Sequence, residues 1–192
     1  VMVELEKIEY KPISVRDLLI EMKNLSELML DLAYSAALFN SHELAEEVLS
    51  LERHIDLLAY LLNMNLMMAA RDVEGAEALL GVSRVSSSAD KISDAAADIA
   101  TIVLRGIGIH PIVREAFERV EERLARVEVK TGSQLAGKNI GSLELGIDVI
   151  ALRRGRRWII DPSEDEVIRV GDVLIARGAQ SGIEELSGLK GK

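Results

Sequence analysis

The 192-residue chain contains no cysteine, which excludes disulfide bonds and thiolate metal ligands. Residues 1–125 carry 22 acidic and 12 basic side chains, a net charge of −10, whereas residues 126–192 carry 10 and 11, a net charge of +1. The acidic first part argues against direct binding of nucleic acid, which needs clustered cations. The unequal charge predicts two domains, residues 1–125 and residues 126–192.

Three long helical patterns fill the first part of the chain. From Ser14 to Phe39, apolar residues recur at three- and four-residue steps, which predicts a helix with one buried stripe and with Ser14 as its cap. A second helix is predicted from His42 to Ala70, capped by Ser41, and a third from Val73 to Leu104. Three long helices with tight connections pack best as an antiparallel bundle.

The most apolar stretch, Leu57 to Ala70, is too short to cross a membrane. It contains Asn63 and Asn65, and a membrane span needs about 20 apolar residues. We therefore expect a buried helix and no transmembrane segment. Val1 to Lys11 lacks the basic part of a secretory signal, so we expect a cytoplasmic protein.

Two pairs of carboxylates are the main candidates for a binding site in the helical part. Glu52 and Asp56 share a face of the second predicted helix, and Asp90 and Asp94 share a face of the third. If these helices are antiparallel neighbours, the pairs meet, and clustered carboxylates repel unless protonated, solvated or neutralised by a cation. The spacing leaves two interpretations: an oxygen-ligated cation site, and a solvated acidic stripe.

After residue 104 the pattern changes from helical to mixed. Pro111 follows a glycine-containing break and begins a fourth, shorter helix that we expect to reach Arg126. Arg126 to Lys130 alternates polar and apolar residues, which predicts a half-buried strand. A short helix is expected to begin near Lys138 and to close at Leu143 to Leu145.

The remainder predicts a compact α+β unit. A hairpin is predicted from Ile147 to Leu152 and Trp158 to Ile160, which are separated by Arg-Arg-Gly-Arg-Arg. Two further strands, Val167 to Val170 and Val173 to Ala176, flank a Gly-Asp turn, and Gly182 to Leu186 predicts a last helical turn. A domain this small is often stabilised by association, so we expect dimerisation.

Basic residues concentrate in the predicted hairpin, at Arg153, Arg154, Arg156 and Arg157. Guanidinium groups near a dimer seam hold anionic ligands through bidentate hydrogen bonds. The alternative interpretation is a set of solvated hairpin charges. Arg153 and Arg154, at the end of the first hairpin strand, are the candidate ligand contacts. Asp172, in the Gly-Asp turn, is assigned a structural role.

The carboxylate pattern resembles that of PhoU proteins. Their E/D-x-x-x-D motif appears here at Glu52 and Asp56 within LERHIDLLAYLL and at Asp90 and Asp94 within ADKISDAAADIA, and the resemblance covers roughly residues 14–110. It implies that these four residues bind metal, a divalent or transition metal ion. PhoU proteins usually have two such repeats and this chain has one, so the resemblance also implies a homodimer.

The second part of the chain resembles TrkA-C domains, the C-terminal lobe of RCK regulators, over about residues 122–187. The motifs that carry the resemblance occur in order: SQLAGKNI at 133–140, IDVIALRR at 147–154, DP at 161–162 and GDVLI at 171–175. Some members of this family bind cyclic di-adenylate between two lobes, which makes a cyclic dinucleotide a candidate ligand. The G-x-G-x-x-G motif of a full RCK regulator is missing.

Together the resemblances imply a non-enzymatic regulatory subunit of cation transport, most simply of potassium. It would bind a membrane cation transporter or channel as a homodimer, peripherally at the inner face of the membrane, and would not bind nucleic acid. The alternative is a PhoU-like regulator of phosphate uptake or signalling. A metal-dependent hydrolase is a third class, but the sequence shows no P-loop, no G-x-S-x-G elbow and no nucleophile–base pattern around its histidines.

Overall fold

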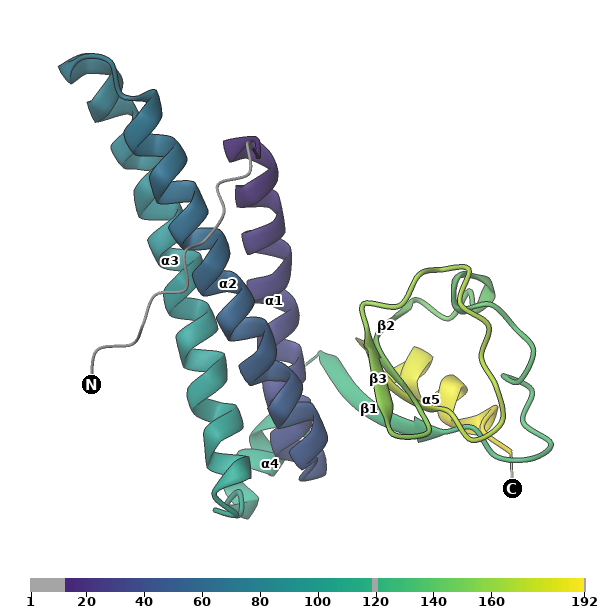
Figure 1. Ribbon diagram of the computed structural model, residues 1–192. Coiled ribbons are helices and arrows are strands. Elements are labelled where there is room, and N and C mark those ends of the chain that lie inside the picture. Colours follow the sequence, from purple (N-terminus) through teal and green to yellow (C-terminus); the bar gives the residue numbers. More distant parts are fainter. Residues whose placement is uncertain (1–12, 119–120, 192) are drawn as a thin grey trace.

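A helical bundle and a small sheet domain follow one another in this computed structural model, which describes residues 13–118 and 121–191 (Figure 1). The stretch from Val1 to Lys11 lies outside the described residues. Three long helices pack against one another in the bundle: α1 (Val15–Phe39), α2 (His42–Ala69) and α3 (Val73–Leu104). The predicted antiparallel bundle followed by a small α+β domain is confirmed.

Residues next to the helix ends determine where the long helices begin and end. Asn40 ends α1 in a left-handed conformation, with a φ of 49°, which asparagine tolerates better than most residues. The predicted cap at Ser41 is confirmed, because its Oγ accepts a hydrogen bond from the Leu44 N–H at 3.3 Å. Asp72 caps α3 by accepting from the Gly75 N–H at 2.7 Å. Ser14 occupies the N-cap position of α1 as predicted, but its side chain makes no capping hydrogen bond.

Small residues on α3 let it lie close against the larger core residues of α1. Buried Ser93 donates a hydrogen bond from its Oγ to the Sδ of Met29 at 3.3 Å, and Ser86 makes the same contact with Met22 at 3.5 Å. The apolar stretch of α2 is buried at Leu58, Leu61, Leu62 and Leu66, but Met67 and Met68 are exposed. Within the described ranges, every helix is too short or too polar to cross a membrane.

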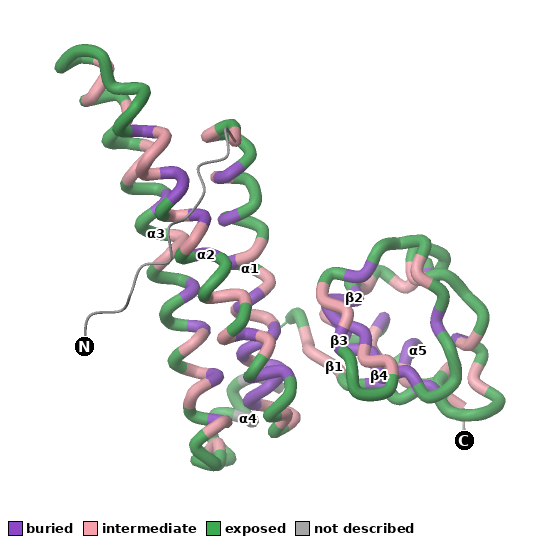
Figure 2. The backbone as a smooth tube through the Cα atoms, viewed as in Figure 1, coloured by how far each residue is buried: buried purple, intermediate pink, exposed green. Residues whose placement is uncertain are grey.

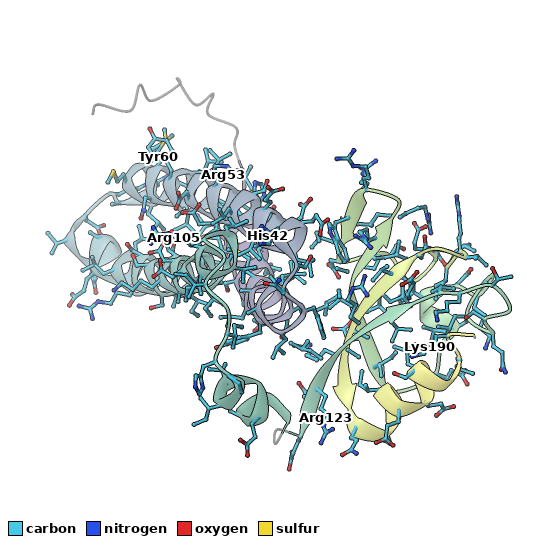
Figure 3. All side chains as sticks on the ribbon, turned by 90° about the horizontal axis from the view of Figure 1, so that it is seen from below. His42, Arg53, Tyr60, Arg105, Arg123 and Lys190 are labelled. Atoms are coloured by element: carbon cyan, nitrogen blue, oxygen red, sulfur yellow. The ribbon has the colours of Figure 1, made fainter. Side chains whose placement is uncertain are left out.

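The predicted fourth helix is too long. Helix α4 (Pro111–Glu118) lies beside the end of the bundle and leads toward β1 (Glu122–Glu128), which includes the labelled Arg123 (Figure 3). Strand β1 pairs with β4 (Val173–Ala179) from Glu122↔Ala179 to Glu128↔Val173. This pairing with a distant segment decides the conformation of residues whose spacing also suits a helix. The predicted boundary between residues 125 and 126 falls inside β1 and stays a prediction.

The sheet has four antiparallel strands in the order β1-β4-β2-β3. Its hairpin, β2 (Ile147–Arg154) and β3 (Arg157–Ile160), is confirmed, as is a strand over Val173–Ala176, and α5 (Gln180–Gly188) closes the domain. Two predictions are wrong. Val167–Val170 is not a strand, because its backbone bonds to the loop around Lys138, with one bridge between Val167 and Asn139. The helix expected from Lys138 to Leu145 is only the 3₁₀ turn η1 (Ile140–Ser142).

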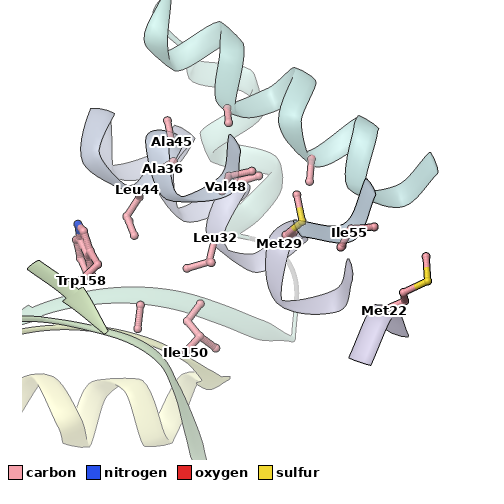
Figure 4. Packing of buried hydrophobic residues seen from close by; sticks show 14 of the residues in the cluster. Met22, Met29, Leu32, Ala36, Leu44, Ala45, Val48, Ile55, Ile150 and Trp158 are labelled. Atoms are coloured by element: carbon pink, nitrogen blue, oxygen red, sulfur yellow. The ribbon is translucent and has the colours of Figure 1, made fainter. Parts of the chain in front are cut away.

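Both faces of the sheet are covered. Val149 and Leu152 of β2 belong to the core beneath α5, whereas Ile150 and Ala151 belong to the core shared with the bundle. A β-bulge between Val149 and Ala151 places these two consecutive residues on the bundle side. Runs of buried residues lie along β2 and β4 (Figure 2). Ile150 and Trp158 point from the sheet toward Leu32 and Leu44 of the bundle (Figure 4).

Candidate functional site

The four predicted metal ligands lie close together across α2 and α3. Burial raises the pKa of Glu52, and the negative charges of Asp56, Asp94 and Asp90 raise it further, against a lowering effect of Arg53. Burial also raises the pKa of Asp90, with further contributions from Asp94 and Asp56. The mutual repulsion shows that the two helices bring both carboxylate pairs to one surface, as antiparallel packing predicts.

This acidic surface does not form a ready-made metal centre. Its oxygen donors suit a hard divalent cation, but among residues 13–118 and 121–191 no three His, Asp or Glu side chains converge closely enough to hold an ion. The predicted metal site therefore stays a prediction, and no chemical step is derived from a metal.

Arg153 and Arg154, the predicted ligand contacts, lie on opposite sides of the sheet. Successive residues of a strand point to opposite faces. Arg153 lies opposite Trp158 in the β2–β3 pairing, with its guanidinium 5.7 Å from the centroid of the indole ring. It faces the bundle, where its nearest carboxylate oxygen is the Oε1 of Glu43 at 3.9 Å. The structure thus separates the two arginines.

Arg154 is committed to a network inside the sheet domain. Its Nε and Nη2 donate to the two carboxylate oxygens of Asp172, at 3.0 and 2.7 Å, and its Nη1 donates to Glu166 at 2.7 Å. Asp172 is 1% exposed and also accepts from the Arg169 N–H at 2.8 Å. The hydrogen bonds to Asp172 and Glu166 raise the pKa of Arg154. Ligand contact by the two arginines stays a prediction, and this geometry favours Arg153.

An ion-pair cluster at the seam between bundle and sheet was missed from the sequence. Arg177 of β4 donates from its Nη1 to Asp31 of α1 at 2.7 Å and from its Nη2 to Asp148 at 3.3 Å. Burial raises the pKa of Asp31, and Arg177 opposes that rise. A lone arginine in the apolar run from Val173 to Ala179 signals a partner of opposite charge, but nothing local identifies Asp31, 146 residues away.

Two domain families match the chain in the regions that these structural units occupy. The PhoU domain matches residues 19–103, which span most of α1 through α3, and the TrkA-C domain matches residues 124–191, which span the sheet and α5. The chain joins a PhoU domain to a TrkA-C domain. Both resemblances found in the sequence are thereby confirmed. The PhoU domain and the TrkA-C domain are both regulatory domains.

The chain is similar to the Ktr system potassium uptake protein C of Bacillus subtilis, with 32% identity over 71 residues. That match covers 35% of this chain, and the chain spans only 32% of the length of that protein.

Solved structures with similarity include the RCK C domain of the potassium transport protein KtrA in complex with c-di-AMP. Its identity is 23%, its TM-score 0.32, and it covers 41% of this chain and 94% of that domain. BusR of S. agalactiae, solved with its busAB-promoter DNA, has 14% identity and a TM-score of 0.33, covering 91% of this chain and 94% of that one. Likenesses this loose carry no functional argument.

Proposed function

We propose that this chain is a non-enzymatic regulator of potassium transport, which senses a small ligand and acts as a homodimer on a membrane cation transporter or channel. The observation that carries the proposal is the TrkA-C domain, together with the 32% identity of 71 residues of this chain to part of a potassium uptake protein. The acidic PhoU domain, with its net negative charge, supports the exclusion of nucleic acid as a partner.

The packed seam between the domains supports a mechanism for signalling. Ile150 and Trp158 share one core with Leu32 of the PhoU domain, and Arg177 ties the sheet to Asp31. A conformational change in one domain would therefore alter the contacts that it makes with the other. A ligand would alter binding to the transporter only through unequal affinity for two arrangements of the protein.

Deletion of the gene in its host should change rubidium-86 uptake under potassium limitation, and the wild-type chain should restore it. An Arg177→Gln variant, which loses the ion pair with Asp31, should restore uptake only partly, because the seam is weakened. Arg169→Gln, an exposed change of the same charge in the same domain, serves as the control and should restore uptake fully.

Phosphate uptake, measured in the same strains, separates this proposal from the alternative that the PhoU domain suggests. A phosphate-uptake defect with normal rubidium fluxes would show that the protein regulates phosphate uptake and not potassium uptake. A mobility-shift assay with DNA tests the exclusion of nucleic acid.

For the acidic surface, we propose weak binding of a divalent cation by Glu52, Asp56, Asp90 and Asp94. Removing the charge of Asp90 distinguishes the effect of repulsion among these carboxylates from the effect of cation binding. Because the folded state raises the pKa of Asp90, its ionisation opposes folding above the unfolded pKa. Asp90→Asn should therefore raise the metal-free unfolding free energy at pH 7 by up to about 1 kcal/mol, since a partly exposed charge is screened. The gain should shrink as the pH falls through the raised pKa of Asp90 and should vanish at about pH 3, where an unfolded aspartate is largely protonated.

Divalent cation should raise the melting temperature of the wild type more than that of Asp90→Asn, because a ligand that binds only the folded state stabilises it. Doubly substituted Asp56→Asn, Asp94→Asn protein should show no metal-dependent shift. Identical melting temperatures of the wild type with and without metal would contradict cation binding and would indicate a solvated acidic surface.

A further inference from the structure

A notch at the seam between the two domains combines groups that neither domain supplies alone. It has a volume of about 420 Å³. The PhoU domain contributes the end of α1, the turn after it and the start of α2, and the TrkA-C domain contributes Arg126 of β1, Arg153 of β2 and Trp158 of β3. This volume is that of a small-molecule site.

Two guanidinium groups of the notch have donors to spare. Arg126 is exposed and has no ion-pair partner within the described part of the chain. Arg153 lies over Trp158, and its distance of 3.9 Å from the Glu43 Oε1 is beyond that of a hydrogen bond. Guanidinium groups match carboxylate and phosphate oxygens through paired N–H donors. The notch therefore offers two cations to an oxyanion.

The indole of Trp158 adds a third, independent donor. The residue is 8% exposed and lines the notch, and its buried Nε1–H finds no acceptor among the residues that the structure describes. An indole nitrogen only donates, and a buried donor without an acceptor is unfavourable. A shift of the indole that opens this nitrogen to the notch would let an acceptor oxygen there satisfy it.

The carboxylate of Glu43 opposes anion binding in the notch. It is the carboxylate that lines the notch, and it approaches Arg153 from the first turn of α2. Its side chain is 59% exposed, so it can turn to solvent when an anion enters. Removal of its charge should strengthen anion binding.

We propose that this notch binds a small oxyanion, a phosphate- or carboxylate-bearing metabolite, through Arg126, Arg153 and the Nε1–H of Trp158. The proposal rests on the proposed function in one respect, because it takes the seam between the domains as the site of the small ligand that the regulator senses. Because residues of both domains line the notch, a bound anion favours the arrangement in which the two domains are docked.

Trp158 makes the site visible, because it is the only tryptophan in the sequence. The full chain is titrated with sodium pyrophosphate, and separately with sodium citrate, at constant ionic strength while tryptophan fluorescence is recorded. We expect a saturable change with at least one of them. Arg126→Gln and Arg153→Gln should each raise Kd at least tenfold, and Glu43→Gln should lower it about threefold. Trp158→Phe, measured by calorimetry, should raise Kd about fivefold.

Arg156→Gln is the matched control, because Arg156 is an exposed hairpin arginine outside the lining of the notch. It removes the same charge and should change Kd by less than twofold. Thermal melting by circular dichroism shows that each variant folds. No saturable change with either anion, or equal weakening by Arg156→Gln, would overturn the site. That outcome leaves the transport proposal standing, because rubidium uptake tests it separately.

Discussion

Asp172→Ala should destabilise the TrkA-C domain by roughly 1.5–3 kcal/mol, the usual contribution of hydrogen bonds to a charged group. Its carboxylate is almost wholly buried and accepts from two guanidinium nitrogens of Arg154 and from the Arg169 N–H. Alanine would leave Arg154 with Glu166 as its remaining carboxylate and would leave the Arg169 N–H without this acceptor. Urea unfolding at fixed protein concentration, followed by the fluorescence of Trp158, measures the loss.

Asp165→Ala provides the comparison for Asp172→Ala. Asp165 is an exposed carboxylate in the same domain, so its removal should change stability by less than about 0.5 kcal/mol. The double variant Asp172→Ala, Arg154→Met should be less destabilised than the sum of the two single variants, because it also removes the cation that has lost one of its two carboxylates. A loss below about 1 kcal/mol for Asp172→Ala would mean that the network contributes little.

Gly182→Ala should destabilise the same domain by about 1–3 kcal/mol, the range found for overpacked cores. Gly182 is a buried residue of α5, and a Cβ added there would collide with the backbone oxygen of Leu145 and lie 2.9 Å from the Cγ2 of Ile147. A backbone oxygen next to β2 cannot move without shifting the strand. The change should appear as a lower urea midpoint with the same slope.

Gly188, in the same helix, gives the opposite expectation. A Cβ at Gly188 meets nothing within 4 Å. Alanine is a better helix former than glycine, so Gly188→Ala should be neutral or should stabilise the domain by up to about 1 kcal/mol. Equal effects of the two substitutions would contradict the close packing of α5 against the start of β2.

Helix limits in the PhoU domain were predictable because their signals are local. Periodic apolar residues and the cap at Ser41 lie within a few residues of the ends they define. The same local logic failed for Glu122 to Arg126, where pairing with β4 formed a strand instead of a helix. It failed again for Val167–Val170, whose backbone bonds to the loop around Lys138 rather than to a neighbouring strand.

The candidate sites divide in the same way. The spacing of Glu52 and Asp56 and of Asp90 and Asp94 was enough to predict one acidic surface, because helix geometry and antiparallel packing bring the pairs together. Spacing also placed Arg153 and Arg154 side by side in sequence. It could not show that one of them would pair with Asp172, because Asp172 meets Arg154 only when the sheet is assembled.

By itself, the sequence indicated the two domain families through motifs that resemble theirs, and it determined the three long helices and the hairpin because periodicity, caps and turn residues act over short distances. Only the tertiary structure decided what covers the second face of the sheet. The uninterrupted apolar run Val173–Ala176 requires cover on both sides, but many apolar surfaces would satisfy it. The bulge at Ile150, the indole of Trp158 and the pair between Arg177 and Asp31 select the PhoU bundle. Those contacts join residues far apart in the chain, so their energies arise only when both domains are folded and docked.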